Sequence, residues 1–547
     1  MTYTNYLSGI LLTISLLSCT SKPKADLLVY NTTIYTIDSS FGKAEAMAIK
    51  DGKIIATGKS DSLLELFETT EKLNAQGQFI YPGFIDAHCH FLAYGKGLQE
   101  CDLSGTTSWQ DVLKRLADFA TGTDSTKWLI GRGWDQNDWE NKEFPTNERL
   151  TAMFPNRPVS LQRIDGHAII INQKAIALAG IQPGQTLTGG EIVTQSGKLT
   201  GVLIDNATDL ADMKMPASTG ADQEKYLHDA EQKCFAVGLT SVQDCGLNFE
   251  QVQLVEKLYQ EGKLSMRMYI MLSDKKENYE YLFAKGKIQT DQLTVNGFKL
   301  YADGALGSRG ACLLQPYSDQ PGHFGFLLKT KAYYDSIIPI IAEKGFQACT
   351  HAIGDSANRM MLNIYTKALK GKPGLRWRIE HAQVINENDF DLFGASQIIP
   401  SVQPTHATSD MYWADARLGP ERLKSAYAYK RLLQQNGWMP LGTDFPVEDI
   451  SPFKTFLAAV VRKDAKGFPD KGFQMENALT REETLRGMTI WAAKAAFEEQ
   501  LKGSLEKGKL ADFIILDKDL LTCDEKQILD VKVVKTFVGG KKVYQNN

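Results

Sequence analysis

Short apolar, strand-like runs alternate with helix-like periodic segments along the body of the chain, from about residue 82 to residue 500. This alternation is typical of a parallel sheet covered by helices. Seven or eight such units over roughly 400 residues fit an α/β fold, a (β/α)8 barrel with insertions. The predicted strands are 79–87, 238–246, 295–304, 345–352, 376–382, 397–405 and 439–444, and the predicted helices are 107–120, 336–344, 356–370, 425–435 and 480–500.

The two ends of the chain carry a different pattern, of short β-runs separated by turn residues such as Asp51-Gly52 and Gly539-Gly540. Neither end has enough strands to be stable alone, so we expect residues 26–81 and 504–547 to form one composite β-sandwich. The barrel then spans 82–503. Residues from about 97 to 216 are rich in Trp, Gly, Asp and Pro, and we expect them to form a lid-like insertion.

An apolar run at residues 7–18 is too short to span a membrane but has the length of a signal-peptide core. The sequence LLSC at 16–19 resembles a bacterial lipobox. We therefore expect residues 1–18 to be a signal peptide, Cys19 to carry a lipid anchor and 19–25 to be a tether. The expected location is the cell envelope, in the periplasm or at the outer membrane if the source is a diderm bacterium. An N-terminus that is merely apolar, or is cleaved elsewhere, is the alternative.

Composition narrows the classes of partner. The 61 Lys and Arg residues against 65 Asp and Glu give a net charge of −4, with 43% apolar residues, as in ordinary globular proteins. No basic run offers a surface to nucleic acid, so no nucleic-acid partner is expected. The eight cysteines include no CxxC pair, which argues against a zinc ribbon or a thioredoxin-like motif. The expected partner is a small-molecule substrate. The sequence neither predicts nor excludes a homodimer.

Two histidines lie two residues apart at the end of the first predicted barrel strand, in DAHCH at 86–90. Side chains at positions i and i+2 of a strand project from the same face, so His88 and His90 can both reach one ion. Such pairs also arise by chance on many surfaces. Only eight histidines occur in 547 residues, however, so a pair at the mouth of a buried strand is unusual.

Other polar residues end further strand runs in the same way, namely His351, His381, Asp444 and Lys299. The carboxyl ends of parallel barrel strands open on one rim, where the active sites of this architecture lie. Four imidazoles and a carboxylate on that rim form a ligand set suited to zinc or a similar metal. The Lys299 ammonium would be repelled by such a metal unless it is chemically altered.

Five motifs along the body resemble the amidohydrolase superfamily of metal-dependent hydrolases: PGFIDAHCH (82–90), THAIGD (350–355), EHAQ (380–383), GTDFP (442–446) and GSLEKGKLADFIILD (503–517). The segments 131–139, 163–168, 201–207 and 299–311 are similar to those of the amidohydrolase family 3 branch, which includes YtcJ-like proteins and N-substituted formamide deformylases. The resemblance covers the chain from about Asp26 onward. It implies a distorted TIM barrel with a composite β-sandwich.

The resemblance also implies two zinc ions, with a single ion or another divalent metal left open. His88, His90 and Asp444 would bind one ion, and His351 and His381 would bind the second.

A carbamylated Lys299 would bridge the two ions, because carbamylation turns the cation into an anionic ligand. Metal-activated hydroxide would attack a substrate carbonyl, and Asp444 would act as general acid and base.

Further residues are candidates for contact with substrate. His167 is either a catalytic group that stabilises the transition state or a buried histidine with a hydrogen-bond partner. Trp134, Asp303 and Arg309 are predicted to bind substrate, with packing, capping and turn roles as the alternatives. His406 follows a predicted strand and is given no role.

The expected activity is metal-dependent hydrolysis of a C–N bond in an amide, formamide or cyclic amide. A deaminase or lactonase on the same scaffold is the alternative, since one ligand set serves several electrophiles. A non-catalytic metal-binding envelope lipoprotein is the alternative from a different class.

Overall fold

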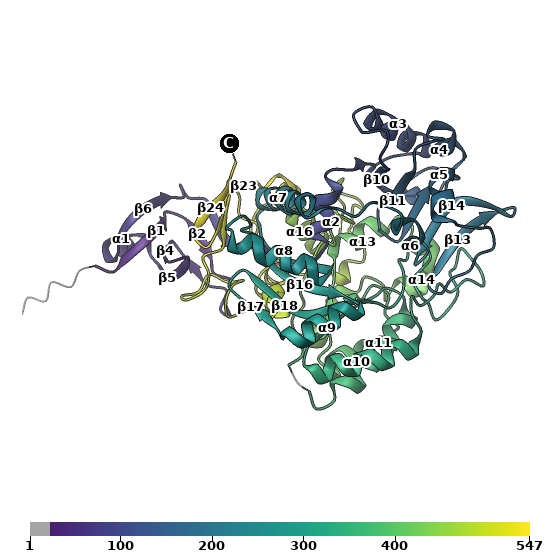
Figure 1. Cartoon of the computed structure of the whole chain (residues 1–547). Coiled ribbons are helices and arrows are strands. Elements are labelled where there is room, and N and C mark those ends of the chain that lie inside the picture. Colours follow the sequence, from purple (N-terminus) through teal and green to yellow (C-terminus); the bar gives the residue numbers. More distant parts are fainter. Residues whose placement is uncertain (1–21, 373, 547) are drawn as a thin grey trace, which may run out of the picture.

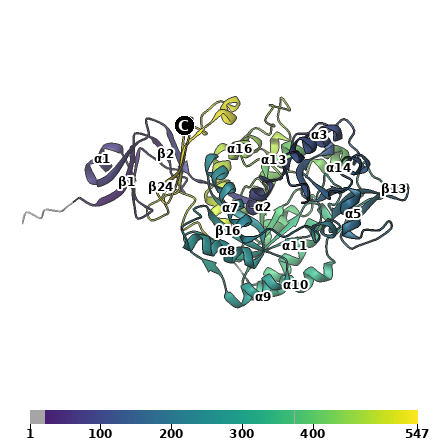
Figure 2. The same cartoon turned by 45° about the horizontal axis from the view of Figure 1, so that its top comes forward.

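The computed structural model describes residues 22–372 and 374–546. The predicted anchor, Cys19, lies outside these residues. The described chain has a central barrel, with a β-sandwich on one side and an insertion on the opposite side (Figures 1 and 2). None of the helices in the described ranges has the length and apolar character needed to cross a membrane. The seven cysteines of the described chain are all free.

The barrel is built on seven parallel strands that neighbour one another in the order β21, β20, β19, β18, β16, β15 and β8. A short strand, β17, pairs antiparallel with the N-terminal part of β18. Their bounds are β8 (Phe84–Cys89), β15 (Leu239–Leu247), β16 (Arg267–Ser273), β17 (Ile288–Gln289), β18 (Leu293–Tyr301), β19 (Gln347–Ala352), β20 (Arg378–His381) and β21 (Ile399–Ser401). Strand β16 was not predicted from the sequence, because a continuous apolar run of this length is compatible with a buried strand and with a helix.

Residues 439–444 fill the gap between β21 and β8 and nearly close the barrel. On one side, Gly442 N donates to Val402 O at 3.1 Å. On the other, Ala87 N donates to Leu441 O at 3.2 Å. This segment is extended and bridges its neighbours without forming a regular strand. The predicted fold class, an α/β TIM-like barrel with additional sheets, is confirmed.

Helices cover the outside of the barrel, and most of the predicted ones are present. The predicted helix 480–500 is two helices, α17 and α18, because the backbone of Thr489 (φ −138°, ψ −97°) breaks the helical path. The helices around the barrel are α2 (Phe91–Gly97), α7 (Gly220–Ala236), α8 (Phe249–Gln260), α9 (Lys276–Lys285), α10 (Lys331–Lys344), α11 (Asp355–Leu369), α12 (Phe390–Ala395), α13 (Pro404–Asp410), α14 (Ala414–Leu423), α15 (Tyr429–Asn436), α16 (Pro452–Val460), α17 (Arg481–Gly487) and α18 (Ile490–Ala495). Helix α6 (Asp209–Asp212) packs on the insertion instead.

The insertion has a six-stranded sheet and a hydrophobic core of its own. Helix α3 packs on it with Val112, Leu113 and Leu116 buried, and the Ser108 side chain caps the helix by accepting from Asp111 N. Its elements are β9 (Cys101–Asp102), α3 (Trp109–Ala120), β10 (Leu129–Trp134), α4 (Glu148–Met153), β11 (Val159–Arg163), β12 (Ala168–Ile171), α5 (Gln173–Ala179), β13 (Gly190–Gln195) and β14 (Lys198–Asp205).

The β-sandwich joins strands from both ends of the chain. One sheet contains β1 (Lys24–Tyr30), β4 (Ala46–Lys50), β5 (Lys53–Gly58) and β6 (Glu68–Asn74), beside α1 (Ser60–Leu66). The other contains β2 (Thr33–Tyr35), β3 (Lys43–Ala44), β7 (Phe79–Pro82), β22 (Phe513–Leu516), β23 (Val533–Val538) and β24 (Lys541–Gln545). Leu27 and Val29 of the first sheet share one hydrophobic core with Phe513 and Phe537 of the second. This core joins the two ends of the chain into one β-sandwich.

Candidate active site

Three side chains from separate barrel segments meet at the carboxyl end of the barrel. His88 on β8, His381 at the end of β20 and Asp444 in the closing segment are all buried, and one ligand atom from each lies within 4.8 Å of the other two. The His351 ring lies 4.6 Å from that of His381, centroid to centroid. His90 Nε2 lies 3.3 Å from Asp444 Oδ1. The structure thus brings together the histidines and the aspartate that sequence analysis selected as ligands.

The hydrogen bonds of these side chains turn one ligand atom of each toward the centre of the cluster. His88 Nδ1 lies 2.5 Å from Glu380 Oε2, and His381 Nδ1 lies 2.8 Å from Gln403 Oε1, so the Nε2 atom of each ring remains for a ligand. Asp444 Oδ1 is buried and accepts no hydrogen bond. A cation would satisfy this oxygen, so the residues fit a divalent metal.

The ionisation of these groups also suits metal binding, which needs neutral imidazoles and ionised carboxylates. Burial lowers the pKa of His88 to about 4 and places the pKa of His381 well below the usual range. Burial opposes ionisation of Asp444, but the surrounding histidines outweigh it and hold the pKa of that carboxyl well below its usual value.

Lys299 lies on β18 beside the same cluster and is fully buried. Its Nζ is 3.1 Å from His88 Nε2 and 4.8 Å from the centre of the Tyr301 ring. A protonated Lys299 therefore donates to the lone pair that His88 would give to a metal.

The insertion contributes His167 to the site. Its Nδ1 lies 2.5 Å from Asp205 Oδ1, at the end of β14, and its ring lies 5.1 Å from that of His351. Burial alone would lower the pKa of His167, but the Asp205 carboxylate outweighs burial and raises it to about 9. Asp205 thus favours the protonated form of His167 and holds the ring in the cavity wall.

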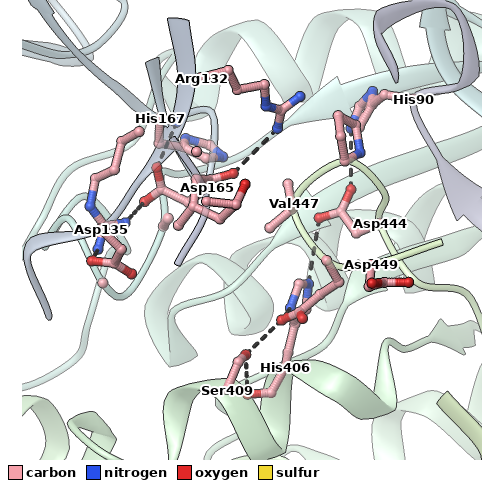
Figure 3. Close-up of a pocket in the computed structure, with 18 of the residues that line it drawn as sticks. His90, Arg132, Asp135, Asp165, His167, His406, Ser409, Asp444, Val447 and Asp449 are labelled. Carbon is pink, nitrogen blue, oxygen red and sulfur yellow. Dashed lines mark hydrogen bonds and ion pairs between the residues drawn. The ribbon is translucent and has the colours of Figure 1, made fainter. Parts of the chain in front are cut away.

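A second group of polar side chains contacts the other carboxylate oxygen of Asp444, Oδ2 (Figure 3). His406, on α13, has Nε2 3.5 Å from Asp444 Oδ2 and Nδ1 3.1 Å from Glu448 Oε1. Ser409 donates to the same Glu448 oxygen at 2.6 Å. Hydrogen bonds to Asp444 and Glu448 raise the pKa of His406 to about 10 against the effect of burial. Sequence analysis assigned neither His406 nor Glu448, although both follow predicted strands closely.

A cavity of about 710 Å³ lies between the barrel mouth and the insertion. The barrel lines it with His90, Lys299, Tyr301, His351, His381, His406 and Asp444, and the insertion with Arg132, Asp135, Arg163, Asp165 and His167. A second cavity, of about 460 Å³, adjoins it and shares His90, Arg132, Asp165, His167 and Tyr301. The volume of the larger cavity suits a small-molecule ligand.

The three residues predicted to bind substrate, Trp134, Asp303 and Arg309, line neither cavity. Trp134 is fully buried in the core of the insertion, where its indole N–H donates to Leu161 O at 2.8 Å. Arg309 forms an ion pair with Asp319 at 2.9 Å, outside both cavities.

Asp303, the third of these residues, is also fully buried and lines neither cavity. Its carboxylate accepts hydrogen bonds from the backbone N–H groups of Cys312, Ile353 and Gly354 at 2.8 to 3.0 Å. It holds the loop after β18 against the end of β19, and its Oδ1 lies 3.6 Å from His351 Nε2, beside the ligand cluster.

A parallel barrel with a His and Asp cluster at the carboxyl ends of its strands is the arrangement of a metal-dependent enzyme. The sequence model of the amidohydrolase family matches residues 71–544. The chain therefore belongs to the amidohydrolase family.

Individual relatives agree with this assignment. The chain is 32% identical to the protein LONG AFTER FAR-RED 3 of Arabidopsis thaliana, covering 95% of this chain and 92% of the relative. It is 24% identical to the N-substituted formamide deformylase of Arthrobacter pascens, covering 95% and 98%. The crystal structure of an uncharacterized metal-dependent hydrolase from Pyrococcus horikoshii is 29% identical with a TM-score of 0.75, covering 91% and 99%. Family and neighbours together support a hydrolytic function.

Proposed function

We propose that this protein hydrolyses a C–N bond in an amide, formamide or cyclic amide of a small molecule, with zinc or another divalent metal as cofactor. The observation that carries the proposal is the buried Asp444 Oδ1, which has no hydrogen-bond donor and faces His88 Nε2 at 3.4 Å and His90 Nε2 at 3.3 Å. The similarity to an N-substituted formamide deformylase supports the choice of bond.

His88, His381 and Asp444 would hold the metal, with His90 and His351 beside them. When bound there, a divalent metal supplies Lewis acidity, which lowers the pKa of water and polarises a carbonyl group. The residues around the metal site transfer the protons and orient the reacting groups.

Asp444 is placed to move the proton. Its carboxylate accepts a proton from the attacking water and then delivers it to the leaving nitrogen as the C–N bond breaks. His406 holds Oδ2 of this carboxylate and is itself held by Glu448, so the orientation of Asp444 is fixed from outside the ligand cluster. His167 faces the cavity as a cation, where its Nε2–H donates to the carbonyl oxygen as negative charge develops on it.

Lys299 is proposed to carry a carbamate. The neutral amine adds to CO2 with loss of one proton, which gives an N-carboxylate and removes the donor that competes for His88 Nε2. Two ions would divide the ligands differently from a single one: His88, His90 and Asp444 would hold the first, His351 and His381 would hold the second, and the new carboxylate would be shared between them. This is the basis for proposing two metals per chain.

Metal analysis of the purified protein, together with a panel of N-substituted formamides, N-acyl amino acids, dipeptides and hydantoins, tests the proposal. Metal-dependent release of an amine, or ring opening of a hydantoin, is the expected result. Nucleobases and lactones are tested beside this panel, and turnover of these compounds alone would favour the deaminase or lactonase alternative. Bound metal without turnover of any compound would favour a binding protein.

The proposed setting is the cell envelope, where a lipid on Cys19 would anchor the protein to a membrane. The lipobox-like LLSC at 16–19 supports this, and the polar residues that follow it suit a tether.

A further inference from the structure

Arg132 is a cation in the cavity wall without an anionic partner. Its guanidinium makes one hydrogen bond, from Nη2 to Ile164 O at 3.3 Å. Its Nε is buried and has no acceptor. Among the described residues, no carboxylate oxygen lies within the 4.0 Å that defines an ion pair with it. A half-buried guanidinium left with one weak acceptor retains donors for a ligand.

The other cations of the larger cavity are already engaged. Four Arg and Lys side chains of the described chain line it: Arg132, Arg163, Lys299 and Lys454. Arg163 forms ion pairs with Asp135 and with Asp165, the latter at 2.5 Å. Lys454 pairs with Asp449 at 2.7 Å. Lys299 belongs to the ligand cluster, so Arg132 is the cation left for an incoming molecule.

Three carboxylates act on Arg132 through their charges, namely Glu100, Asp444 and Asp165. Each of them has another partner: Asp165 pairs with Arg163, Glu100 lies 3.6 Å from Lys96, and Asp444 belongs to the ligand cluster. The long-range attraction of these acids therefore leaves the hydrogen-bond donors of the guanidinium without a carboxylate acceptor.

The local backbone directs Arg132 into the cavity. In a regular strand Arg132 and Trp134 would share a face, but the register of β10 against β11 shifts between them. Gly133 occupies this bulge with φ of +108°, and a Cβ there would lie 2.4 Å from Ser104 Oγ. Trp134 consequently enters the core of the insertion while Arg132 faces the opening.

Arg132 lies beside the proposed chemistry. Arg132 lines both cavities together with His90 and His167. In the view of Figure 3 its guanidinium lies between these two side chains. A group bound by Arg132 would thus belong to the same molecule whose carbonyl lies near His167. The guanidinium fork matches a carboxylate in two parallel hydrogen bonds.

We propose that Arg132 binds a carboxylate of the substrate, so that the preferred substrates are amides or formamides of an acidic compound, such as N-acyl amino acids. This inference rests on the proposed function for the identity of the bond that is cleaved. The carboxylate subsite itself is independent of turnover, which allows a separate test.

Binding of two ketones that cannot be hydrolysed tests the subsite by calorimetry on the metal-loaded full chain. The first, 4-oxo-4-phenylbutanoate, has the shape of N-benzoylglycine, and the second, 1-phenylbutan-1-one, lacks the carboxylate. The wild-type protein is expected to bind the acid about 10- to 100-fold more tightly than the neutral ketone, as a charge-assisted pair provides. Arg132→Met is expected to reduce this ratio to near one.

The matched control is Arg149→Met, which removes an exposed arginine from α4 of the same insertion and is expected to keep the wild-type ratio. Melting temperatures check that each variant folds. If Arg132→Met does not fold, Arg132→Gln replaces it, because the amide still donates to Ile164 O.

Equal binding of the two ketones by the wild type, or an unchanged preference in the Arg132 variants, would overturn the proposal and place the carboxylate elsewhere, for instance on the metal. A preference that depends on Arg132 supports the subsite even if the panel of amides shows no turnover. In that case the proposed hydrolysis fails and the anion site stands.

Discussion

His88 Nδ1 lies 2.5 Å from Glu380 Oε2, and neither side chain is exposed to solvent. Glu380 also accepts from Arg378 Nη2 at 2.9 Å. Arg378 and His88 together outweigh burial and keep the pKa of Glu380 below its usual value, so the ionised carboxylate accepts a hydrogen bond from the N–H at His88 Nδ1. This fixes the tautomer of His88, whose Nε2 lone pair then faces the ligand cluster.

Replacing Glu380 by Gln is therefore expected to weaken metal binding about 10- to 100-fold. A glutamine amide can donate to Nδ1, which would place the ring proton on Nε2 and block the ligand atom. Titration of metal against a competing chelator measures the change. Glu387→Gln is the control, because that side chain is 61% exposed and pairs with Arg431 on the surface. Equal metal affinity of Glu380→Gln and the wild type would contradict this role.

Asp444→Asn is expected to lower turnover about 10²- to 10⁴-fold, the usual contribution of a general acid and base. The asparagine has a similar shape but cannot accept the proton of the attacking water. Because Asp444 is also a proposed ligand, rates are compared at saturating metal, with the metal content of each protein measured. Asp335→Asn, an exposed change on α10, serves as the control. Full turnover of the Asp444 variant would exclude it as the proton-transfer group.

The proposed carbamate on Lys299 predicts a change in metal content. Wild-type protein loaded in the presence of bicarbonate is expected to hold two metals per chain, and Lys299→Ala is expected to hold about one fewer, since the bridging ligand is lost. With ¹³C-bicarbonate, a carbamate carbonyl signal should appear in the ¹³C NMR spectrum of the wild type only. The same metal content in both proteins would refute the bridge.

The proposed anchor predicts a change in location. Cys19→Ala is expected to move most of the protein from the membrane fraction to the soluble fraction, because the thiol that carries the lipid is absent. Fractionation followed by immunoblotting measures this, with the internal Cys523→Ala as the control. An unchanged distribution of Cys19→Ala would show that another segment holds the protein to the membrane.

The residues that the sequence predicted best are those whose position follows from topology alone. His88, His351 and His381 each end an apolar run, and parallel barrel strands bring such ends to one rim whatever the details of packing. The fold class was also predictable, because alternating strands and helices are compatible with few other arrangements.

Arg132 and His406 were beyond this reasoning, because their directions depend on local geometry. Trp134 was expected in the cavity. The bulge at Gly133 changes the faces of β10, so Arg132 lies in the cavity instead. His406 sits on α13, which begins directly after β21, and its direction depends on where that helix starts. Periodicity along the sequence does not encode either feature.

The link between the sandwich and the C-terminal segment predicts a pH-dependent stability. Asp519 accepts hydrogen bonds from Tyr35 at 2.7 Å and Tyr81 at 2.5 Å, and these outweigh burial and lower the pKa of Asp519. A carboxyl whose pKa is lower in the folded state stabilises the fold above its unfolded pKa of about 3.9, and this stabilisation is lost as pH falls through the folded value.

Asp519→Asn is expected to lower the free energy of unfolding by about 1–3 kcal/mol at pH 7. The cost should shrink below pH of about 4, as denaturant unfolding at several pH values would show. Tyr35→Phe, which removes one donor, should follow the same trend with a smaller effect, and a cost independent of pH would contradict the assignment.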